Sequence, residues 1–368
     1  MQYRRLGRTE LQVSAIGLGT EYLNRKPVQT VESVINEAVE AGVNYVDIVF
    51  TFPDYLENLK RAIDGRREQL ILTGHIGSDE SNGHYRLEHH VEACARRFDG
   101  MLSQLNTDYM DIAMIQMVND REDLEEMMRP GGKLELAMRL KNEGKARFVG
   151  MSGHKVPAAR QAIESGLIDV LMFPINLAWD FAPMRKEFLG ECSEKDVGLV
   201  AMKAYAGGRV FQRRELGVTP AQCISYVLDQ PGVSTVVPGP KNVKEFREAI
   251  DALDAPESAR SYRGLTERFQ EELTGHCVYC NHCLPCPAGI DIGRVMQTLD
   301  KEEQRYEEIK NKVDFFYPGR IRIAKEGRFT GKVNQCIKCG VCMKRCPFGV
   351  DILEKMDKIK QMFGNNIA

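Results

Sequence analysis

Short apolar runs alternate with longer segments of helical periodicity along most of this chain. The helical segments, such as residues 31–42 and 87–105, repeat apolar residues every three or four positions and often end at glycine. Eight strand–helix units in succession predict a parallel sheet, and eight such units can close into a (β/α)8 barrel, the TIM barrel. The predicted strands are residues 13–20, 45–49, 70–76, 109–117, 146–154, 169–176, 198–205 and 233–240.

An open, doubly wound sheet is the alternative for the same order of elements, but no glycine-rich phosphate-binding motif follows the first predicted strand. In a barrel, functional side chains are expected at the carboxyl ends of the strands. Residues 254–264 are predicted to be a linker, and from about residue 265 helices flank clusters of cysteines. We therefore expect a barrel over residues 1–255 and a small helical domain over residues 265–368.

Composition narrows the class of protein. Hydrophobic residues make up 43% of the chain, which is ample for a buried core, and the net charge of −2 argues against nucleic acid or an anionic membrane as a partner. The longest apolar runs are too short to span a membrane, and residues 1–11 lack the apolar core of a signal peptide. The expected location is the cytoplasm, where clustered cysteines indicate metal rather than disulfides.

The strongest chemical signal is two runs of four cysteines, each followed by a proline. Their spacing is that of bacterial two-cluster ferredoxins, in which the fourth cysteine of each run binds the cluster of the other run. Zinc is the alternative, but structural zinc sites use pairs of cysteines rather than two quartets. The pattern assigns one [4Fe–4S] cluster to Cys277, Cys280, Cys283 and Cys346, and another to Cys336, Cys339, Cys342 and Cys286.

Residues 287–335 separate the two runs and include a charged helical stretch, so we expect a helical ferredoxin-like domain with a long insertion. The three remaining cysteines lie in predicted helices of the barrel. They are expected to be small core residues rather than ligands. They are Cys94, Cys192 and Cys223.

The barrel sequence resembles the aldo-keto reductase family. The resemblance is carried by residues 3–20, 40–49, 108–116, 144–154, 198–208 and 220–246, and "CVYCNHCLPCPAGIDI" (277–292) looks like the signature of a branch with a C-terminal two-cluster ferredoxin. It implies a TIM barrel that binds a nicotinamide dinucleotide, NAD(P), extended over the strand ends without a Rossmann motif.

The resemblance also implies a catalytic tetrad of Asp, Tyr, Lys and His. The tyrosine gives a proton to the carbonyl, the lysine paired to the aspartate lowers the tyrosine pKa, and the histidine orients the carbonyl. Only Asp47 matches this pattern. Phe52, Gly74 and Gln116 occupy the other three positions. Because phenylalanine has no proton to give, conventional carbonyl reduction is not expected.

Four residues are candidates for a replacement site. Asp47 either hydrogen-bonds the nicotinamide ribose or, with a raised pKa, becomes the acid itself. Tyr55, placed near the active rim if a helix opens at the preceding aspartate, is either a substitute phenol or a packing residue. His75 ends the third strand and is either a proton donor near neutral pH or a structural group. Gln116 can hydrogen-bond a carbonyl but cannot protonate it.

His154, at the end of the fifth predicted strand, has the same two interpretations as His75. The other histidines near the third predicted barrel helix, His84, His89 and His90, are expected to be solvated.

By the same resemblance, several residues would line the nicotinamide and the phosphates. Gly153, Met172 and Ala249 depart from the residues that the family often places at cofactor contacts, which weakens this prediction. Lys241 or Arg247 would meet a 2′-phosphate. The full set of predicted cofactor residues is Gly19, Thr20, Asp47, Ser152, Asn176, Lys203, Gly207, Gly208 and Lys241.

A [4Fe–4S] cluster moves one electron, whereas a nicotinamide moves a hydride. We therefore expect an oxidoreductase in which a ferredoxin- or flavodoxin-type carrier feeds electrons through the clusters to a small substrate or cofactor at the barrel mouth. No flavin motif is evident, although the sequence leaves room for a flavin. The alternatives are an NAD(P)H-dependent carbonyl reductase with substitute proton donors and structural clusters, and a non-catalytic barrel that only relays electrons.

Overall fold

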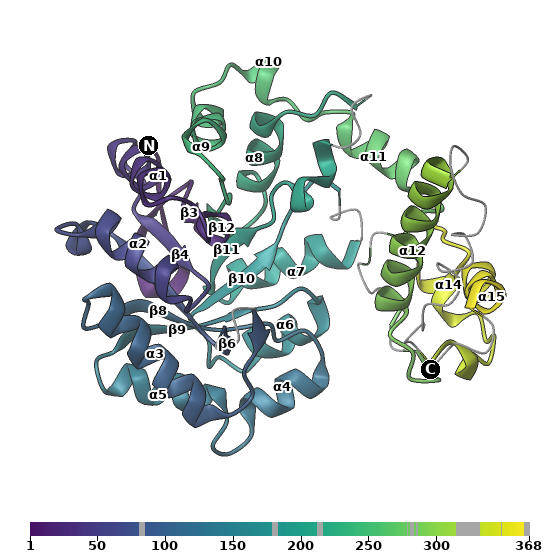
Figure 1. Cartoon of the computed structure of the whole chain (residues 1–368), viewed down its shortest axis with the longest axis horizontal. Coiled ribbons are helices and arrows are strands. Elements are labelled where there is room, and N and C mark those ends of the chain that lie inside the picture. Colours follow the sequence, from purple (N-terminus) through teal and green to yellow (C-terminus); the bar gives the residue numbers. More distant parts are fainter. Residues whose placement is uncertain are drawn as a thin grey trace. The chain divides into compact units, whose positions relative to one another are not determined.

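A computed structural model of the chain describes residues 1–80, 85–178, 183–211, 216–277, 279, 283–284, 286–313, 332–346 and 348–363. The chain divides into two compact units, Met1–Leu265 and Thr266–Ala368. In Figure 1, which is coloured along the sequence, the first unit runs from purple to green and the second from green to yellow.

The first unit is built on eight parallel strands that neighbour one another in sequence order. The first and last strands are joined, because Ile16 forms a parallel bridge with Val236, and the Gly17 amide donates to the Val236 carbonyl at 2.8 Å. The sheet therefore closes into a (β/α)8 barrel, and all eight predicted strands are confirmed. They are β3 (Leu18–Gly19), β4 (Tyr45–Ile48), β5 (Ile71–Ile76), β8 (Met110–Ile115), β9 (Ala146–Ser152), β10 (Val170–Pro174), β11 (Gly198–Met202) and β12 (Val233–Val236).

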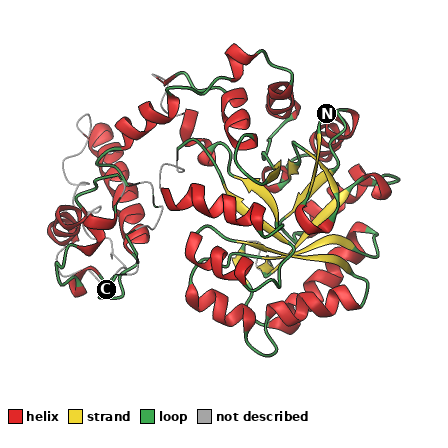
Figure 2. Cartoon of the chain, turned by 180° about the vertical axis from the view of Figure 1, so that it is seen from behind, coloured by secondary structure: helices red, strands yellow, loops and turns green. Residues whose placement is uncertain are grey.

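Helices surround this barrel, as the yellow strands inside red helices in Figure 2 show. Each long helix has a buried apolar face, and Cys94, Cys192 and Cys223 lie buried on three of them, as predicted. The helices are α1 (Val28–Glu40), α2 (Pro53–Ile63), α3 (Val91–Leu105), α4 (Arg121–Met128), α5 (Lys133–Asn142), α6 (Val156–Glu164), α7 (Pro183–Glu194), α8 (Pro220–Leu228), α9 (Val243–Ile250) and α10 (Glu257–Arg260).

Two small antiparallel pairs accompany the barrel, β1 (Tyr3–Arg5) with β2 (Gln12–Ser14), and β6 (Ser78–Asp79) with β7 (Arg86–Leu87). Inside the barrel, apolar side chains from several strands pack together, including Ile112, Met114, Val170, Met172 and Val200. The barrel interior is thus a packed core, which leaves the carboxyl ends of the strands as the place for chemistry.

The second unit is helical. Its main elements are α11 (Leu265–Leu273), which starts at the boundary between the units, α12 (Ile292–Val313), α14 (Val341–Arg345) and α15 (Ile352–Phe363), with a short 3-10 turn, η7 (Val333–Gln335). Buried apolar residues hold these elements together. They include Ile290, Val295, Met296, Leu299, Phe348, Val350 and Ile359.

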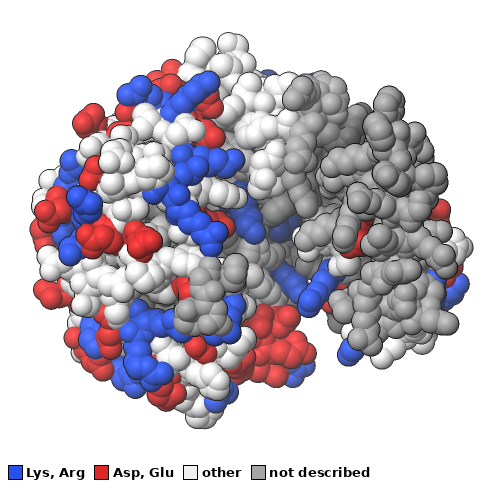
Figure 3. Space-filling view, viewed as in Figure 1, with Lys and Arg blue, Asp and Glu red and all other residues white. Residues whose placement is uncertain are grey.

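Within the described ranges, no helix combines the length and the apolar character that a membrane crossing requires. On the face of the barrel in Figure 3, lysine and arginine side chains are interspersed with aspartate and glutamate. This mixed surface agrees with the near-neutral net charge of the sequence.

Candidate active site

An aspartate–histidine pair lies inside the barrel near the carboxyl ends of β4 and β5. Asp47 on β4 is paired in register with Thr73 on β5, so His75, two residues further on, shares its face. His75 Nε2 lies 2.9 Å from Asp47 Oδ1, and both residues are more than nine-tenths buried. Because a carboxylate only accepts, Nε2 carries the proton of this bond. The other ring nitrogen, Nδ1, is buried without a hydrogen-bond partner in the described part of the chain.

This geometry corrects the predicted position of the missing lysine. A Cβ added to Gly74 would lie 3.0 Å from Met101 Sδ and from Met110 Cγ, so this position faces the helical layer and not Asp47. The residue that meets the aspartate is His75, one position later. Successive residues of a strand point to opposite faces, so His75 and not Gly74 shares the face of Asp47.

Tyr55 lies deeper than predicted. Helix α2 begins at Pro53 with Phe52 preceding it and no side-chain cap, so the predicted cap at Asp54 is wrong. Proline suits the first position of a helix because its missing N–H would have no partner there. Tyr55 is then fully buried, its hydroxyl shares a hydrogen bond with the Thr20 hydroxyl, and burial raises its pKa above the ordinary value. A phenol in this state is a weak acid.

Phe52 and Gln116 occupy the remaining tetrad positions. Phe52 packs edge-on against Phe50, with ring centroids 5.5 Å apart, and brings no hydroxyl to the site. Gln116 follows β8, where its backbone N–H donates to the Ile76 carbonyl at 3.0 Å. Its side chain is buried, and Oε1 has no partner among the described residues. An unpaired buried oxygen is costly, so it marks a place where a bound group would find a hydrogen-bond acceptor.

His154 serves as a structural link, the second of the two interpretations above. Its Nδ1 lies 3.0 Å from Asn119 Oδ1 and its Nε2 lies 2.8 Å from Lys203 Nζ. Burial, with the neighbouring lysine charge, lowers the pKa of His154 to about 3. The ring is therefore neutral at physiological pH and cannot give a proton. The solvated His89 and His90 are confirmed as exposed, and His84 lies outside the described residues.

The predicted cofactor residues gather at the carboxyl ends of the strands. Gly19 ends β3, the Thr20 hydroxyl donates to the Asp47 carbonyl at 2.5 Å, and Ser152 Oγ accepts from the Met117 amide at 3.1 Å. The fully buried Asn176 donates through Nδ2 to the Lys203 carbonyl at 3.1 Å.

Two glycines give the loop after β11 its shape, because Gly207 and Gly208 both adopt positive φ, 66° and 84°. Lys241 lies over the Tyr22 ring at 5.7 Å from its centroid. Arg247 instead forms a two-pronged ion pair with Glu37, with both N–O distances 2.7 Å, which leaves Lys241 as the better candidate for a phosphate.

Two polar residues at this face escaped the sequence prediction. Glu21 follows β3 and Asn119 follows β8, and both positions are the strand ends at which a barrel carries its chemistry. Their positions shortly after predicted strands could therefore have identified both residues as candidates for the site. Glu21 is exposed, but partial desolvation of its carboxyl raises the pKa, and Lys203, Asp47 and His75 all lie near enough to influence it.

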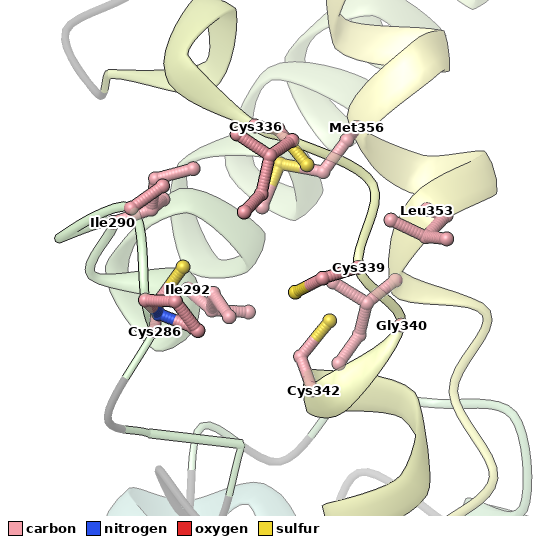
Figure 4. A pocket seen from close by; sticks show the side chains of 13 residues that line it. Cys286, Ile290, Ile292, Cys336, Cys339, Gly340, Cys342, Leu353 and Met356 are labelled. Atoms are coloured by element: carbon pink, nitrogen blue, oxygen red, sulfur yellow. The ribbon is translucent and has the colours of Figure 1, made fainter.

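In the second unit, four cysteines line one cavity of about 370 Å³, counted with its open mouth. Figure 4 shows Cys286 on one side, with Cys339 and Cys342 opposite and Cys336 above them. Burial raises the pKa of the Cys342 thiol, and the nearby thiols of Cys336 and Cys286 raise it further. The remaining wall is apolar and includes Ile290, Ile292, Leu353 and Met356.

Across the described residues, no three His, Cys, Asp or Glu side chains are arranged around a single metal ion. A single zinc ion draws its sulfurs to about 2.3 Å each and hence to within about 4 Å of one another, whereas a cubane holds its four thiolates further apart. Of the other predicted quartet, Cys277, Cys283 and Cys346 are described, and Cys280 lies outside the described residues.

The model of the aldo/keto reductase family matches residues 15–219, more than half of the chain. The chain belongs to the aldo/keto reductase family. Its similarity to the uncharacterized oxidoreductase YqkF of Bacillus subtilis is 24% identity over 316 residues, which covers 75% of this chain and 96% of that protein. The L-galactose dehydrogenase of Arabidopsis thaliana is 23% identical over 294 residues, with 70% and 90% covered.

Among solved structures, an aldo-keto reductase from Bacillus halodurans in its holo form matches with a TM-score of 0.61 and 19% identity. The match covers 73% of this chain and 96% of that one. At this identity the likeness supports the barrel fold. Family membership and the oxidoreductase relatives together identify this aldo-keto reductase as an oxidoreductase.

Proposed function

We propose that this chain is an iron–sulfur oxidoreductase of the aldo-keto reductase type, in which electrons pass through two [4Fe–4S] clusters to a small substrate or cofactor at the barrel mouth. The observation that carries the proposal is that Cys286, from the first run, lines the same cavity as Cys336, Cys339 and Cys342. Crossed ligation in two-cluster ferredoxins brings together this combination of cysteines.

The residues present fit a cluster at this cavity. Four thiol side chains line it, and most of the rest of its wall is apolar. When bound, a cluster supplies one-electron transfer, and its reduction potential depends on hydrogen bonding and solvent exposure around its sulfurs. The second cluster would be held by Cys277, Cys280, Cys283 and Cys346, an assignment supported by spacing.

In the barrel, NAD(P) is a compatible cofactor, which supplies a hydride when bound. Thr20, Ser152, Asn176 and the glycine pair of the 206–211 loop would line it, and Lys241 would meet a phosphate. Phe52 cannot donate a proton, and the Tyr55 hydroxyl is committed to Thr20. A barrel without the usual proton donor suits electron transfer from the clusters better than ordinary ketone reduction.

The proposal includes an electron-carrier partner and a location in the cell. An electron carrier of ferredoxin or flavodoxin type would deliver electrons, and the cytoplasm would keep the cysteines reduced for cluster assembly. The mixed surface charge gives no support to nucleic acid or membrane partners.

One observation favours a second candidate, an NAD(P)H-dependent carbonyl reductase with structural or regulatory clusters. His75 beside Asp47 provides a polar pair where the family places lysine and aspartate, and histidine gains and loses protons near neutral pH. One relative bears the name of a sugar dehydrogenase, which agrees with this candidate.

Two measurements on anaerobically purified protein test these functions. Iron and acid-labile sulfide should each reach about eight per chain, since each cube holds four of both. Absence of iron after anaerobic reconstitution, or stoichiometric zinc in its place, would refute the cluster proposal. A saturating titration with NADPH and NADH then tests the barrel, because failure of both to bind would leave a barrel that only relays electrons.

A further inference from the structure

The segment that carries the second run of cysteines is positively charged and exposed. Residues 331–350 contain four lysines and arginines and no aspartate or glutamate. All four of these side chains are exposed, and they are Lys332, Lys338, Lys344 and Arg345. The whole chain has a net charge of −2, so the rest of it is net negative. Residues 332–345, which we call the basic segment, therefore create a positive potential that differs in sign from the charge of the remaining chain.

The first run of cysteines lies in a different setting. Residues 276–292, which carry it, contain no lysine or arginine. Cys283 of the first run is only 7% exposed, whereas Cys339 of the second run is exposed. Because electron transfer between proteins requires close approach, the cavity beside the second run is the one that a partner protein can reach.

The backbone of the basic segment turns its apolar and charged side chains outward. In Figure 4 the sulfurs of Cys339 and Cys342 point into the cavity. On either side of Cys339 the chain turns sharply, since Lys338 has φ of 53° and Gly340 has φ of 70°. Ile337 lines the cavity and is nevertheless 67% exposed, so it stands at the rim. The rim thus offers an apolar side chain directly beside a lysine.

Much of the positive charge of the segment is available to a partner. Lys338 pairs with Asp357 at 2.8 Å between Nζ and Oδ2, but both side chains are about half exposed, and such a surface pair is weak. Lys332 and Lys344 form no ion pair with any residue that the structure describes in this unit. These two ammonium groups can therefore meet the carboxylates of another molecule.

The surroundings of this charge favour an acidic protein over other polyanions. A long nucleic acid or an anionic membrane would also extend over the net negative remainder of the chain, which repels it. Residues 332–347 contain no aromatic side chain on which a base could stack. A small acidic protein would contact only the basic segment, and Ile337 would supply the apolar centre that protein interfaces have.

We propose that the basic segment, with Ile337 at its centre, is the docking surface for an acidic one-electron carrier protein. This inference rests on the proposed function for the presence of a cluster in the cavity that Cys339 lines. One electron leaves the reduced carrier and one is gained at this cavity, so the transfer needs no further reactant. Small, transient interfaces are typical of redox encounters, and complementary charge chiefly raises the rate of association.

The test measures the affinity of the full-length protein for an oxidised flavodoxin of strongly negative net charge, by surface plasmon resonance. Lys344→Glu should weaken binding about fivefold or more at low salt, because an attractive charge becomes repulsive. Lys60→Glu is the matched control, since it changes the net charge equally at an exposed position on α2, and it should leave Kd unchanged. Raising the salt concentration from about 20 to about 200 mM should weaken binding by the parent protein and reduce the effect of Lys344→Glu.

A second pair of variants tests the apolar centre. Ile337→Ala should weaken flavodoxin binding about threefold, because apolar contact is lost, whereas Ile337→Val should bind almost as the parent does. Dithionite, a small donor that needs no docking surface, should still reduce every variant completely. Iron content equal to that of the parent shows that a variant has kept its clusters. Lys332→Glu, further from the cysteines, repeats the charge test if Lys344→Glu loses iron.

Several outcomes overturn the docking surface. They are failure of the parent to bind flavodoxin, unchanged affinity in both Lys344→Glu and Ile337→Ala, and equally tight binding of cytochrome c, a basic one-electron carrier. Tighter binding of a single-stranded oligonucleotide, lost in Lys344→Glu, would assign the segment to nucleic acid instead. Absence of iron from the parent refutes the proposed function, whereas full iron content with unchanged affinity in the variants refutes only the docking surface.

Discussion

Asp47 and His75 form a buried hydrogen-bonded pair, with 2.9 Å between Oδ1 and Nε2, where the family resemblance implies aspartate and lysine. The strand register puts the histidine, and not Gly74, on the face of Asp47. The aspartate thus keeps a polar, hydrogen-bonding partner, but that partner is a histidine ring and not the ammonium group of a lysine.

Phe52, which stands where the family resemblance implies a tyrosine, predicts how the barrel behaves toward ordinary carbonyl substrates. A panel of aldehydes and ketones with NADPH should turn over at or near background, because Phe52 gives no proton. Phe52→Tyr alone should gain little, since no lysine tunes the new phenol. Combining it with His75→Lys and Gln116→His should give a clear gain. The measurement is NADPH oxidation, and turnover typical of the family in the parent protein would favour the carbonyl reductase candidate.

How much the sequence predicts differs between the fold and the site. Alternating apolar runs mark buried parallel strands, and all eight were located because each is a continuous core segment. The site depends on which of two neighbouring residues of a strand points toward Asp47. Apolar patterning does not decide this between Gly74 and His75, because neither is part of the apolar pattern. Helix starts are similarly sensitive, and Pro53 opens α2 where Asp54 offered a plausible cap.

Long-range partners are the other part that patterning does not reveal. Nothing in the local sequence joins His154 to Lys203, because their contact arises only when the loops after β9 and β11 meet at one face. Cysteine spacing is the exception, since a metal cluster fixes the ligand pattern chemically. It predicted that Cys286 would accompany the second run, and these cysteines line one cavity.

Crossed ligation makes a specific prediction for that cavity. If the proposed clusters are bound, Cys286→Ser should perturb the one assigned to Cys336, Cys339 and Cys342 and spare most of the other. Electron paramagnetic resonance of the reduced protein, with iron analysis, measures each cluster. Cys94→Ser is the control, because this buried cysteine lies in the barrel helix α3 and should leave iron content unchanged. Disturbance of only the cluster of the first run would show that the crossed assignment is wrong.

The low pKa of His154 predicts how barrel stability changes with pH. The folded pKa is about 3, whereas an unfolded histidine has a pKa of about 6.5. Above about pH 6.5 the residue is neutral in both states. Between about pH 6.5 and pH 3, His154 is protonated in the unfolded chain but not in the folded chain. The folded state therefore loses stability as pH falls through this range.

The slope is at most about 1.4 kcal/mol per pH unit, and less here because His154 is only half-buried and solvent screens it. The free energy of unfolding is measured by urea unfolding, followed by the fluorescence of Trp179, the single tryptophan of the chain. Relative to His154→Gln, the parent should lose about 1 kcal/mol between about pH 6.5 and pH 5. Parallel pH profiles for the two proteins would contradict the lowered pKa of His154.

Electrons should enter the protein from a one-electron donor. The proposed clusters should be reduced by a low-potential one-electron donor such as dithionite, and only slowly by NADPH alone. A hydride carries two electrons together, and a cluster accepts one, so transfer between them needs a converter such as a flavin. The measurement is the loss of visible cluster absorbance under anaerobic conditions, in protein shown by extraction to contain no flavin. Adding a ferredoxin or flavodoxin with its reductase should accelerate bleaching by NADPH. Rapid and complete bleaching by NADPH without any carrier would overturn the carrier-fed proposal and favour a nicotinamide-driven enzyme.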